Sequence, residues 1–571
     1  MRKTLLFVLL CLASTAVLGQ PGPGPGGPPL PPPLAPPVEP AGNPGTAARV
    51  MLGTALYWDE QLSSTNTIAC ATCHQFTAGG VDPRSAIGTT THPGADGLPG
   101  TRDDVTGSPG VPQTCEDGGI VWTEESGFAI QVTGRSTPPA INAGYADALF
   151  WDGRAADALV DPLSGETLLA SGAALEVQAL GPILSSVEMG YAGRDWADVI
   201  NKLDGAAPLA LAPSIPGELA TWIGSRDYEQ LFAEAFGDVA ITPARIAMAI
   251  AAYERSLLAN ETPFDAFLGG DDNALTQQEQ RGLNVFRTAG CQACHAGSET
   301  TDHAFRYIGL APVEDDLGRF DVTGQNGDRG RFKTSDLRNL SLRAPFMHNG
   351  AFGTIAEVID FYDRGGDFSA PNLDPRIRPR GLSNGQKADL EAFLMGGLTD
   401  PRVASAIGPF AHPELSAEEE ASVTVGIGGI GGRFGVPAVL VIGPALAGTD
   451  RFVIGVDGVP DATPVRFVVA PDDPGTVLAD AEAGARWVVT TTARSADVGT
   501  GYASVSLPLP HDGAPLVGRW FVDDDAAPAG IAVSAPVTIA PLAPAGGRSA
   551  RLFAGDFEAG SGNCGVPVSL R

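Results

Sequence analysis

Two short cysteine–histidine units carry the clearest chemistry in this sequence of 571 residues. They read Cys70-Ala71-Thr72-Cys73-His74 and Cys291-Gln292-Ala293-Cys294-His295. Two thiols at this spacing can add to the two vinyl groups of a haem, and the histidine that follows can bind its iron. A redox dithiol does not need the histidine, and a zinc knuckle would need a further Cys or His pair nearby. The units therefore predict two covalently attached haem c groups, held by Cys70, Cys73 and His74 and by Cys291, Cys294 and His295.

The remaining cysteines add little. The sequence holds seven in total, which leaves Cys11, Cys115 and Cys564 outside the two units. This number excludes a disulfide-rich scaffold. Cys115 and Cys564 could pair, although nothing in the sequence requires it.

The first 19 residues are typical of a signal peptide. Arg2 and Lys3 precede an apolar stretch from Leu5 to Leu18 that is short for a bilayer span, and cleavage before Gln20 fits the small residue Gly19. No later segment offers 18 uninterrupted apolar residues. We therefore expect a periplasmic or otherwise exported protein without a membrane span.

The net charge bounds the class of partner. A formal charge of -30 and a pI near 4.5 argue against nucleic acid as a ligand. An acidic surface could attract a basic redox protein, but acidity is also an ordinary way to keep an exported protein soluble. We favour the second interpretation.

The chain divides by composition into further parts. Residues 20–46 are rich in Pro and Gly, which predicts an extended, unfolded tether outside any core. Residues 47–270 and 271–413 have a helical pattern broken by Gly and Pro loops. Thr276 and Glu279 form a capping-box pattern ahead of an apolar stripe at Leu283 and Phe286, and a second helix is expected over Gln386–Met395 after Ser383.

Residues 414–571 change to a β pattern. Short alternating runs are bounded by Gly, Pro and Asp turns, which predicts a β-sandwich followed by a tail. The runs are Ala438–Ile442, Phe452–Ile454, Val465–Val469 and Trp487–Val489. This part holds a single histidine, His511, and the lone Cys564, so we expect a binding or spacer module there. Residues 552–558 resemble short terminal tails of exported bacterial proteins.

Several ordered blocks resemble the bacterial di-haem cytochrome c peroxidases and their MauG-type relatives, from about Leu52 to Pro401. The blocks are Leu52–Asp59, Phe150–Ala155, Gly181–Met189, Leu337–Asn339 and Ala344–Gly350. The resemblance implies a mainly α protein with two cytochrome-c-like haem domains, here followed by the C-terminal β-sandwich. It makes 47–270 the N-terminal, peroxidatic haem domain and 271–413 the C-terminal, electron-transfer haem domain.

Glu188 is the candidate for proton transfer. It lies between Val187 and Met189 in an apolar block, where a carboxyl tends to be desolvated and to have a raised pKa suited to moving a proton. The resemblance assigns the same role to this glutamate, places a glutamine ten residues earlier at Gln178, and makes Trp151 an electron relay between the haems. The family's separation of this tryptophan and glutamate is lengthened here by an insertion around Asp157 to Ala174, expected as a surface loop.

The sixth ligand of the second haem is left open by the residues themselves. The peroxidases have a methionine 14 residues after the histidine that here is His348, and MauG-type enzymes have an iron-binding tyrosine at that place. This sequence has Tyr362 there. The alternative is that Tyr362 is a half-buried helix residue and that Met347 or Met395 is the ligand. His92 is a candidate mobile ligand of the first haem, and a loop histidine is the alternative.

Calcium is a further expectation from the resemblance. The family's ion lies between the haem domains and is bound by an asparagine, replaced here by Ser136, and by backbone carbonyls that correspond to Arg343 and Pro345. The acidic loop from Gly94 to Asp104 could also bind calcium through hard oxygen ligands, although a solvated turn is the simpler interpretation.

The sequence therefore predicts an exported di-haem peroxidase that reduces hydrogen peroxide to water with electrons from an external donor, such as a small cytochrome c or a cupredoxin. In this scheme His74 binds the peroxide-reactive haem and His295 the electron-entry haem. Two alternatives stay open: a MauG-type oxidase acting on a partner protein or small molecule, and a di-haem electron-transfer cytochrome without enzymatic activity.

Overall fold

The structure is a computed structural model. It describes residues 30–85, 91–92, 94, 104–112, 122–123, 127–128, 130–416, 423–425, 438–442, 452–460, 463–485, 487–492, 494–497, 500–507, 515–528 and 531–539. The expected signal peptide, Cys115, Cys564, His511, the tail and most of the acidic loop after Gly94 lie outside these residues. Within them, no helix combines the length and apolar character needed to span a bilayer.

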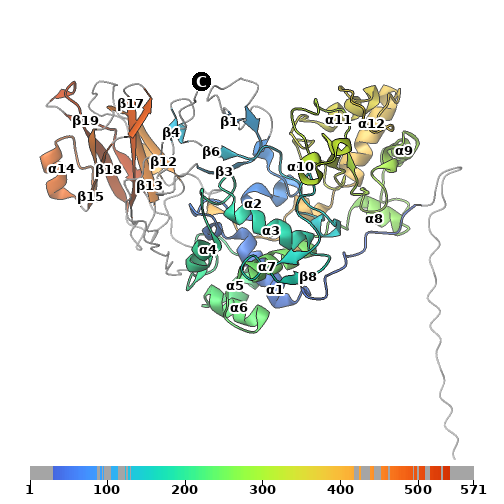
Figure 1. The fold of residues 1–571 in the computed structure, drawn as a ribbon, viewed down its shortest axis with the longest axis horizontal. Helices are drawn as coiled ribbons and strands as arrows, with labels where there is room; N and C mark the ends of the chain where they lie inside the picture. The colour runs from blue at the N-terminus through green and yellow to red at the C-terminus, as the bar shows by residue number, and fades with distance from the viewer. Residues whose placement is uncertain are drawn as a thin grey trace, which may run out of the picture.

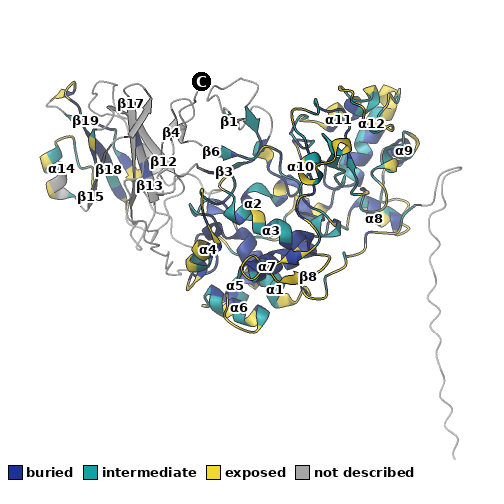
Figure 2. Cartoon of the chain, in the orientation of Figure 1, coloured by how far each residue is buried: buried dark blue, intermediate teal, exposed yellow. Residues whose placement is uncertain are grey.

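The first helical cluster forms around two crossing helices, α1 and α7. Gly53 in α1 allows this crossing, because a Cβ atom there would lie 1.9 Å from the carbonyl oxygen of Ala249. Nearly every side chain of α7 is buried, and the buried residues of the molecule concentrate around this pair (Figure 2). The helices of this part are α1 (Ala47–Trp58), α2 (Cys70–Cys73), α3 (Ala174–Leu184), α4 (Trp196–Leu203), α5 (Gly217–Ile223), α6 (Tyr228–Phe236) and α7 (Pro243–Ser256).

The second cluster is built on α9 and α12. Gly282 in α9 lets the two helices touch, since a Cβ atom there would lie 2.0 Å from the carbonyl oxygen of Asp389. The predicted capping box of Thr276 and Glu279 is confirmed at the start of α9, and Ser383 caps α12 as expected. The helices are α8 (Pro263–Leu268), α9 (Gln277–Thr288), α10 (Phe320–Thr323), α11 (Ile355–Arg364) and α12 (Asn384–Ala392), which is continued by a π-helical turn over Phe393–Gly397. The next helix, α13 (Pro401–Ala404), packs its Val403 in the first cluster.

The two cores do not follow the boundaries expected from composition. Phe264 and Leu268 of α8 pack with the second cluster, although the sequence placed them in the first domain. Conversely, Phe410 and Leu415 pack in the first cluster, and the ring of His412 stacks on Trp58 at 4.2 Å. The chain therefore returns to the first cluster after it has completed the second.

Residues 30–46 correct the expectation of a free tether. Leu34 is 7% exposed and Asn43 is fully buried. The Asn43 amide donates to Glu176 at 2.7 Å and to the carbonyl of Met248 at 2.8 Å, while Leu30 packs against the second cluster. The segment therefore runs from the second cluster to the foot of α1 (Figure 1). Its prolines allow this, because an extended chain without internal hydrogen bonds can lie on a surface through its side chains.

The part beyond residue 420 forms two antiparallel sheets, at the left of Figure 1. One has the order β11-β20-β18-β14-β15 with β19 paired to β18, and the other β12-β13-β17-β16. The strands are β11 (Val423–Val425), β12 (Ala438–Ile442), β13 (Phe452–Pro460), β14 (Pro464–Ala470), β15 (Trp487–Thr492), β16 (Arg494–Asp497), β17 (Thr500–Leu507), β18 (Leu516–Asp523), β19 (Ile531–Val533) and β20 (Val537–Ile539), with α14 (Leu478–Gly484) between β14 and β15. All four strands expected from the alternating runs are confirmed.

The helical part also contains short two-stranded antiparallel sheets. They are β1 (Thr91–His92) with β2 (Val105–Thr106), β3 (Pro109–Pro112) with β6 (Ile130–Val132), β4 (Trp122–Thr123) with β5 (Gly127–Phe128), β7 (Leu159–Val160) with β8 (Thr167–Leu169), and β9 (Phe305–Arg306) with β10 (Phe332–Lys333). The insertion after Asp157 forms the β7–β8 hairpin, whose tip is exposed at Leu163. The insertion is therefore at the surface, as expected, and it forms a hairpin.

Candidate haem sites

The first cysteine–histidine unit forms α2 and the turn that follows it. The amide of His74 donates to the carbonyl of Cys70 at 3.1 Å, which closes the turn. The ring nitrogen Nδ1 of His74 lies 3.3 Å from the carbonyl oxygen of Gly80. Such a contact fixes the ring and leaves Nε2 to bind a metal. Burial lowers the pKa of His74, which favours the neutral ring that an iron ligand must be.

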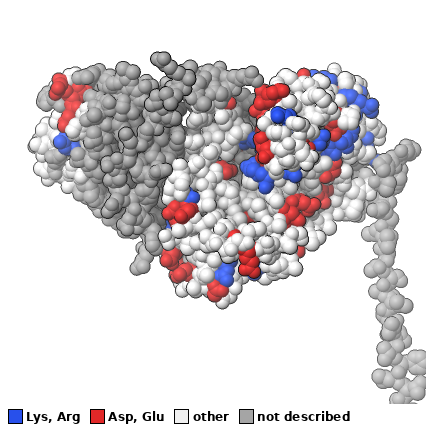
Figure 3. Space-filling model, in the orientation of Figure 1, with Lys and Arg blue, Asp and Glu red and all other residues white. Residues whose placement is uncertain are grey.

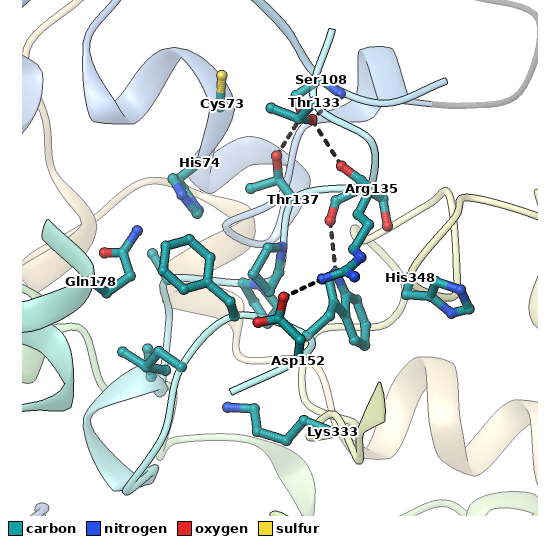
Figure 4. Close-up of a pocket in the computed structure, with 18 of the residues that line it drawn as sticks. Cys73, His74, Ser108, Thr133, Arg135, Thr137, Asp152, Gln178, Lys333 and His348 are labelled. Carbon is teal, nitrogen blue, oxygen red and sulfur yellow. Dashed lines mark hydrogen bonds and ion pairs between the residues drawn. The ribbon is translucent and has the colours of Figure 1, made fainter. Parts of the chain in front are cut away.

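A cavity of about 1090 Å³ opens beside this unit and reaches the second cluster. Its volume lies near the upper end of the roughly 300–1,000 Å³ typical of small-molecule and cofactor sites. Apolar side chains and both thiols of the unit face the same space, with none of the four haem-unit cysteines in a disulfide. The residues around Cys70, Cys73 and His74 therefore fit a covalently attached haem. The arrangement of Cys73, His74, Gln178, Lys333 and His348 is drawn in Figure 4.

Glu188 and Gln178 both line this cavity, as the sequence predicted. Glu188 is held by its backbone, whose carbonyl accepts from the amide of Val111 at 3.0 Å. Gly110 permits this contact, because a Cβ atom there would lie 2.0 Å from the carbonyl oxygen of Val187. Burial raises the pKa of the Glu188 carboxyl, partly offset by a bond from Ser185 and by the charge of Arg154. A carboxyl whose pKa is raised is a stronger base, which suits it to take up a proton and release it.

Trp151 also lines the cavity and is held from both sides. Its indole Nε1 donates to the carbonyl of Ser136 at 2.7 Å, and its own carbonyl accepts from the amide of Lys333 at 2.8 Å. The ring lies 6.3 Å from that of His348, which stacks on Phe332 at 3.6 Å. Trp151 thus joins a segment of the first haem unit to segments that follow the second.

The second unit repeats the geometry of the first. The amide of His295 donates to the carbonyl of Cys291 at 3.0 Å, and its Nδ1 lies 3.1 Å from the carbonyl oxygen of Thr300. Burial lowers the pKa of His295. A cleft of about 410 Å³ is lined by residues 304–307, 331 and 371–376, and Arg376 in its lining donates to the carbonyl of Ala293 at 3.2 Å. The unit's cysteines and His295 do not line this cleft; the spacing of the unit and the Nδ1 contact of His295 are what fit a second attached haem.

Tyr362 lies close to this second unit, on α11. Burial raises the pKa of its phenol, and the thiols of Cys294 and Cys291 act in the same direction because both are near. Met395 packs against the second hydrophobic cluster together with Cys291, and the carbonyl of Met347 accepts a bond from Ser136 at 2.6 Å. Tyr362 and Met395 thus both lie in the part of the molecule that carries the second unit.

The residues expected at a calcium ion are only partly brought together. The amide of Ser136 donates to the carbonyl of His348 at 2.7 Å, and its hydroxyl to that of Met347. Arg343 is buried and donates to Asp336 at 3.0 Å, while the Ala344–Pro345 peptide bond is cis. Among the described residues, no group of three or more His, Cys, Asp or Glu side chains is placed to hold a metal ion.

His92 lies next to the cavity lining, because its partner in the strand pair is Val105, which lines the cavity. It lies in β1, and its Nδ1 accepts from the amide of Gly94 at 3.2 Å. It is not one of the residues that line the cavity beside His74. Its role as a mobile ligand stays a prediction.

Two charged residues of the cavity were missed from the sequence. Glu254 is buried beside Cys70 and Tyr57, its Oε2 atom has no hydrogen-bond partner among the described residues, and burial raises its pKa to about 8. Lys333 is buried, which lowers its pKa to about 8. A glutamate at the end of a helix that is apolar on all faces was a usable signal for Glu254. Lys333 gave none, since it sits in a polar loop.

The sequence of this chain is similar to those of known proteins over most of its helical part. The family model described as di-haem cytochrome c peroxidase matches residues 47–273. The methylamine utilization protein MauG of Methylorubrum extorquens is 31% identical over 356 residues, which cover 62% of this chain and 78% of that protein. This chain belongs to the di-haem cytochrome c peroxidase and MauG family.

A further relative and a solved structure are also similar to this chain. The cytochrome c551 peroxidase of Pseudomonas aeruginosa is 29% identical over 327 residues, covering 56% of this chain and 72% of the relative. A solved structure of a MauG-like protein associated with microbial copper homeostasis has a TM-score of 0.47 and 25% identity, covering 67% of this chain and 97% of that one. Membership of this family supports two haem c groups as the cofactors of the chain and an oxidoreductase of peroxidase type.

Proposed function

We propose that the chain reduces hydrogen peroxide to water in the cavity beside His74, with electrons delivered from an external redox protein. The observation that carries the proposal is that one cavity is lined by Cys70, Cys73 and His74 together with the buried carboxyl of Glu188. An iron ligand and a proton-holding group are the two parts that this reaction requires in one place.

The haem, when bound, supplies the iron chemistry that breaks the O–O bond. The overall reaction consumes one peroxide, two electrons and two protons and forms two waters. Glu188 takes the proton from the oxygen nearer the iron and gives it to the leaving oxygen. The Gln178 amide, on the neighbouring helix α3, offers a donor and an acceptor that can orient peroxide in the same cavity.

Trp151 is the proposed electron relay between the two haem units. Support comes from its bonds to Ser136 on one side and Lys333 on the other. A tryptophan held by one hydrogen bond at its ring and one at its backbone keeps its position and therefore its separation from donor and acceptor groups.

The MauG-type reaction, oxidation of a partner protein or small molecule, is the second candidate. It is favoured by the position of Tyr362 beside Cys291 and Cys294. An anionic phenolate ligand would favour the oxidised iron and lower its potential, which suits storage of oxidising equivalents. A thioether from Met347 or Met395 would do the opposite.

Calcium, export and the donor complete the proposal. We place calcium between the haem units near Ser136, whose hydroxyl and amide donate to the backbone carbonyls of residues 347 and 348. The carbonyls of Arg343 and Pro345 remain the other proposed ligands. Export to the periplasm follows from the signal-peptide pattern, and a small cytochrome c or cupredoxin is the proposed donor.

Two measurements on the purified protein test the function. Intact mass after acid–acetone extraction should stay two haem masses above the polypeptide. EPR of the oxidised protein should then show one high-spin haem, and peroxide should be consumed with two equivalents of donor. Two low-spin haems in every redox state, without peroxide consumption, would make the chain an electron carrier.

A further inference from the structure

The two haem-attachment turns differ in how much protein covers them. In the first unit, Ala71 and Thr72 between the cysteines are buried. In the second, Gln292 is half-buried, Ala293 is exposed, and the chain stays exposed at Ala296 just after the histidine. The second turn is therefore more accessible to an outside molecule than the first.

Three arginines follow closely in the sequence near this open turn, and the outer two contact it. They belong to the sequence Arg376-Ile377-Arg378-Pro379-Arg380, and we call these three side chains the arginine collar. The guanidinium of Arg376 donates to the carbonyl of Ala293 at 3.2 Å. That of Arg380 lies 3.3 Å from the position of a Cβ atom on Gly290 and donates to the carbonyl of Arg376. Arg376 and Arg380 of the collar thus lie next to Ala293 and Gly290, on either side of the second unit's first residues.

The charge of the collar is only partly neutralised. Asp374 pairs with Arg376 and also faces Arg306, which is further paired with Asp302. Asp363, whose side chain accepts from the amide of Leu382, is paired with Lys387. Arg378 is exposed, and within the part of the chain that the structure describes it has no hydrogen bond or ion pair. Among the described residues, Arg376 is therefore the one collar arginine with an ion pair.

This local charge is opposite to that of the whole chain. Lys and Arg gather over the part of the molecule that carries α9, α11 and α12, while Asp and Glu predominate elsewhere on the same view (Figure 3). At physiological ionic strength, charges separated by more than about 8 Å are largely screened from each other. A docking molecule therefore senses the collar more strongly than the net charge of -30.

We propose that the arginine collar and the open turn of the second haem unit form the docking surface for an acidic redox protein. The proposal rests on the proposed function, because it assigns the chemistry of the electron donor. The donor would give one electron in each encounter and leave oxidised, so two encounters serve each peroxide. Electron-transfer encounters of this kind are small and weak, and opposite charges mainly increase their association rate.

The sign of the salt dependence tests the proposal without a known partner. The fully reduced di-haem protein is mixed in a stopped-flow instrument with ferricyanide, an anion, or with tris(phenanthroline)cobalt(III), a cation, and haem oxidation is followed from low to high ionic strength. The collar predicts that the ferricyanide rate falls as salt increases. The net charge alone predicts that it rises, and that the cobalt complex is favoured at low salt.

Arg378→Glu should lower the ferricyanide rate at low salt by about tenfold, within the range of electrostatic steering. Arg378→Gln should lower it less, and serves if the reversal disturbs folding. The matched control is Arg245→Glu, which makes the same charge change on α7 of the first cluster and should leave both rates unchanged.

A ferricyanide rate that rises with salt, or equal effects of Arg378→Glu and Arg245→Glu, would overturn the docking surface. Peroxide consumption by the unmodified protein with hydroquinone, an uncharged donor, tests the proposed function separately. Absence of that activity with a falling ferricyanide rate would reject the enzyme and keep the docking surface.

Discussion

The indole of Trp151 donates a 2.7 Å hydrogen bond to the backbone carbonyl of Ser136. Ser136 in turn donates its amide to the carbonyl of His348 and its hydroxyl to that of Met347. The ring is therefore fixed to a segment that belongs to the second haem unit, and its position depends on one serine rather than on packing alone.

Trp151→Phe should keep both haems attached and slow electron transfer between them by roughly tenfold or more, equivalent to about 1.4 kcal/mol in the barrier. Phenylalanine is harder to oxidise and cannot bond to Ser136. Stopped-flow spectra after one equivalent of peroxide measure this step. Trp222→Phe on α5 is the matched control and should behave as the unmodified protein. Equal rates in all three proteins would remove Trp151 from the electron path.

Glu188→Gln should leave the haems bound and reduce peroxide turnover by on the order of 10²–10⁴-fold, the usual loss for an acid–base group. Glutamine keeps the shape of the side chain but cannot take up and release the proton. Steady-state peroxide consumption measures the effect, with the exposed Glu218→Gln as control. Because Glu188 must be ionised to take up the first proton and burial raises its pKa, turnover should also decline as pH falls through that raised pKa. Full activity of the variant would assign the proton transfer to another group.

Tyr362→Phe should abolish tyrosinate modes in the resonance Raman spectrum of the oxidised protein. The prediction follows from the closeness of Tyr362 to both cysteines of the second unit. Tyr307→Phe is the control, since Tyr307 is buried in the same part of the chain and bonds to the carbonyl of Ala311 at 2.8 Å. A methionine-to-iron charge-transfer band in the unmodified protein would contradict the assignment and indicate Met347 or Met395.

Glu254 should make stability depend on pH. Burial raises its pKa in the folded protein to about 8 from the ordinary value of 4.5, so the folded state keeps a proton that the unfolded state releases. Its contribution is therefore present at low pH and is lost as pH rises between these values, at about 1.4 kcal/mol per unit. Glu254→Gln should become increasingly more stable than the unmodified protein from pH 5 to pH 8, measured by denaturant unfolding. The control is Glu166→Gln, at an exposed residue, whose free energy of unfolding should change with pH in parallel with that of the unmodified protein. A parallel pH dependence for Glu254→Gln would contradict the prediction and show that the Glu254 carboxyl is solvated.

Features set by neighbours in the chain were predictable from the sequence. The two haem units, the capping boxes at Thr276 and Ser383 and the strands of the β part all depend on residues a few positions apart. The meeting of Glu188, Gln178 and Trp151 in one cavity came from the family resemblance, because no periodicity relates a helix, a loop and a turn that lie far apart in sequence.

What could not be predicted depends on contacts between distant residues. Lys333 reaches the cavity only because β10 carries it past Trp151, and His412 returns to stack on Trp58 after the second cluster is complete. Residues 30–46 were misjudged because Pro and Gly content describes the free chain. The contacts of Leu34 and Asn43 with partners far along the sequence decide where that segment lies.

That segment also constrains the order in which the molecule assembles. Asn43 can form its hydrogen bond only after Met248 has been synthesised, and Leu30 can pack only after the second cluster, which extends to Leu398, is complete. A chain made from its N-terminus must therefore keep residues 30–43 undocked while several hundred later residues are synthesised, and closing such long loops is slow. Leu34 lines the wall of the first haem cavity, so this wall stays open through most of synthesis. Residues 30–43 are thus synthesised first but dock among the last, after a haem has had access to the cavity that Leu34 lines.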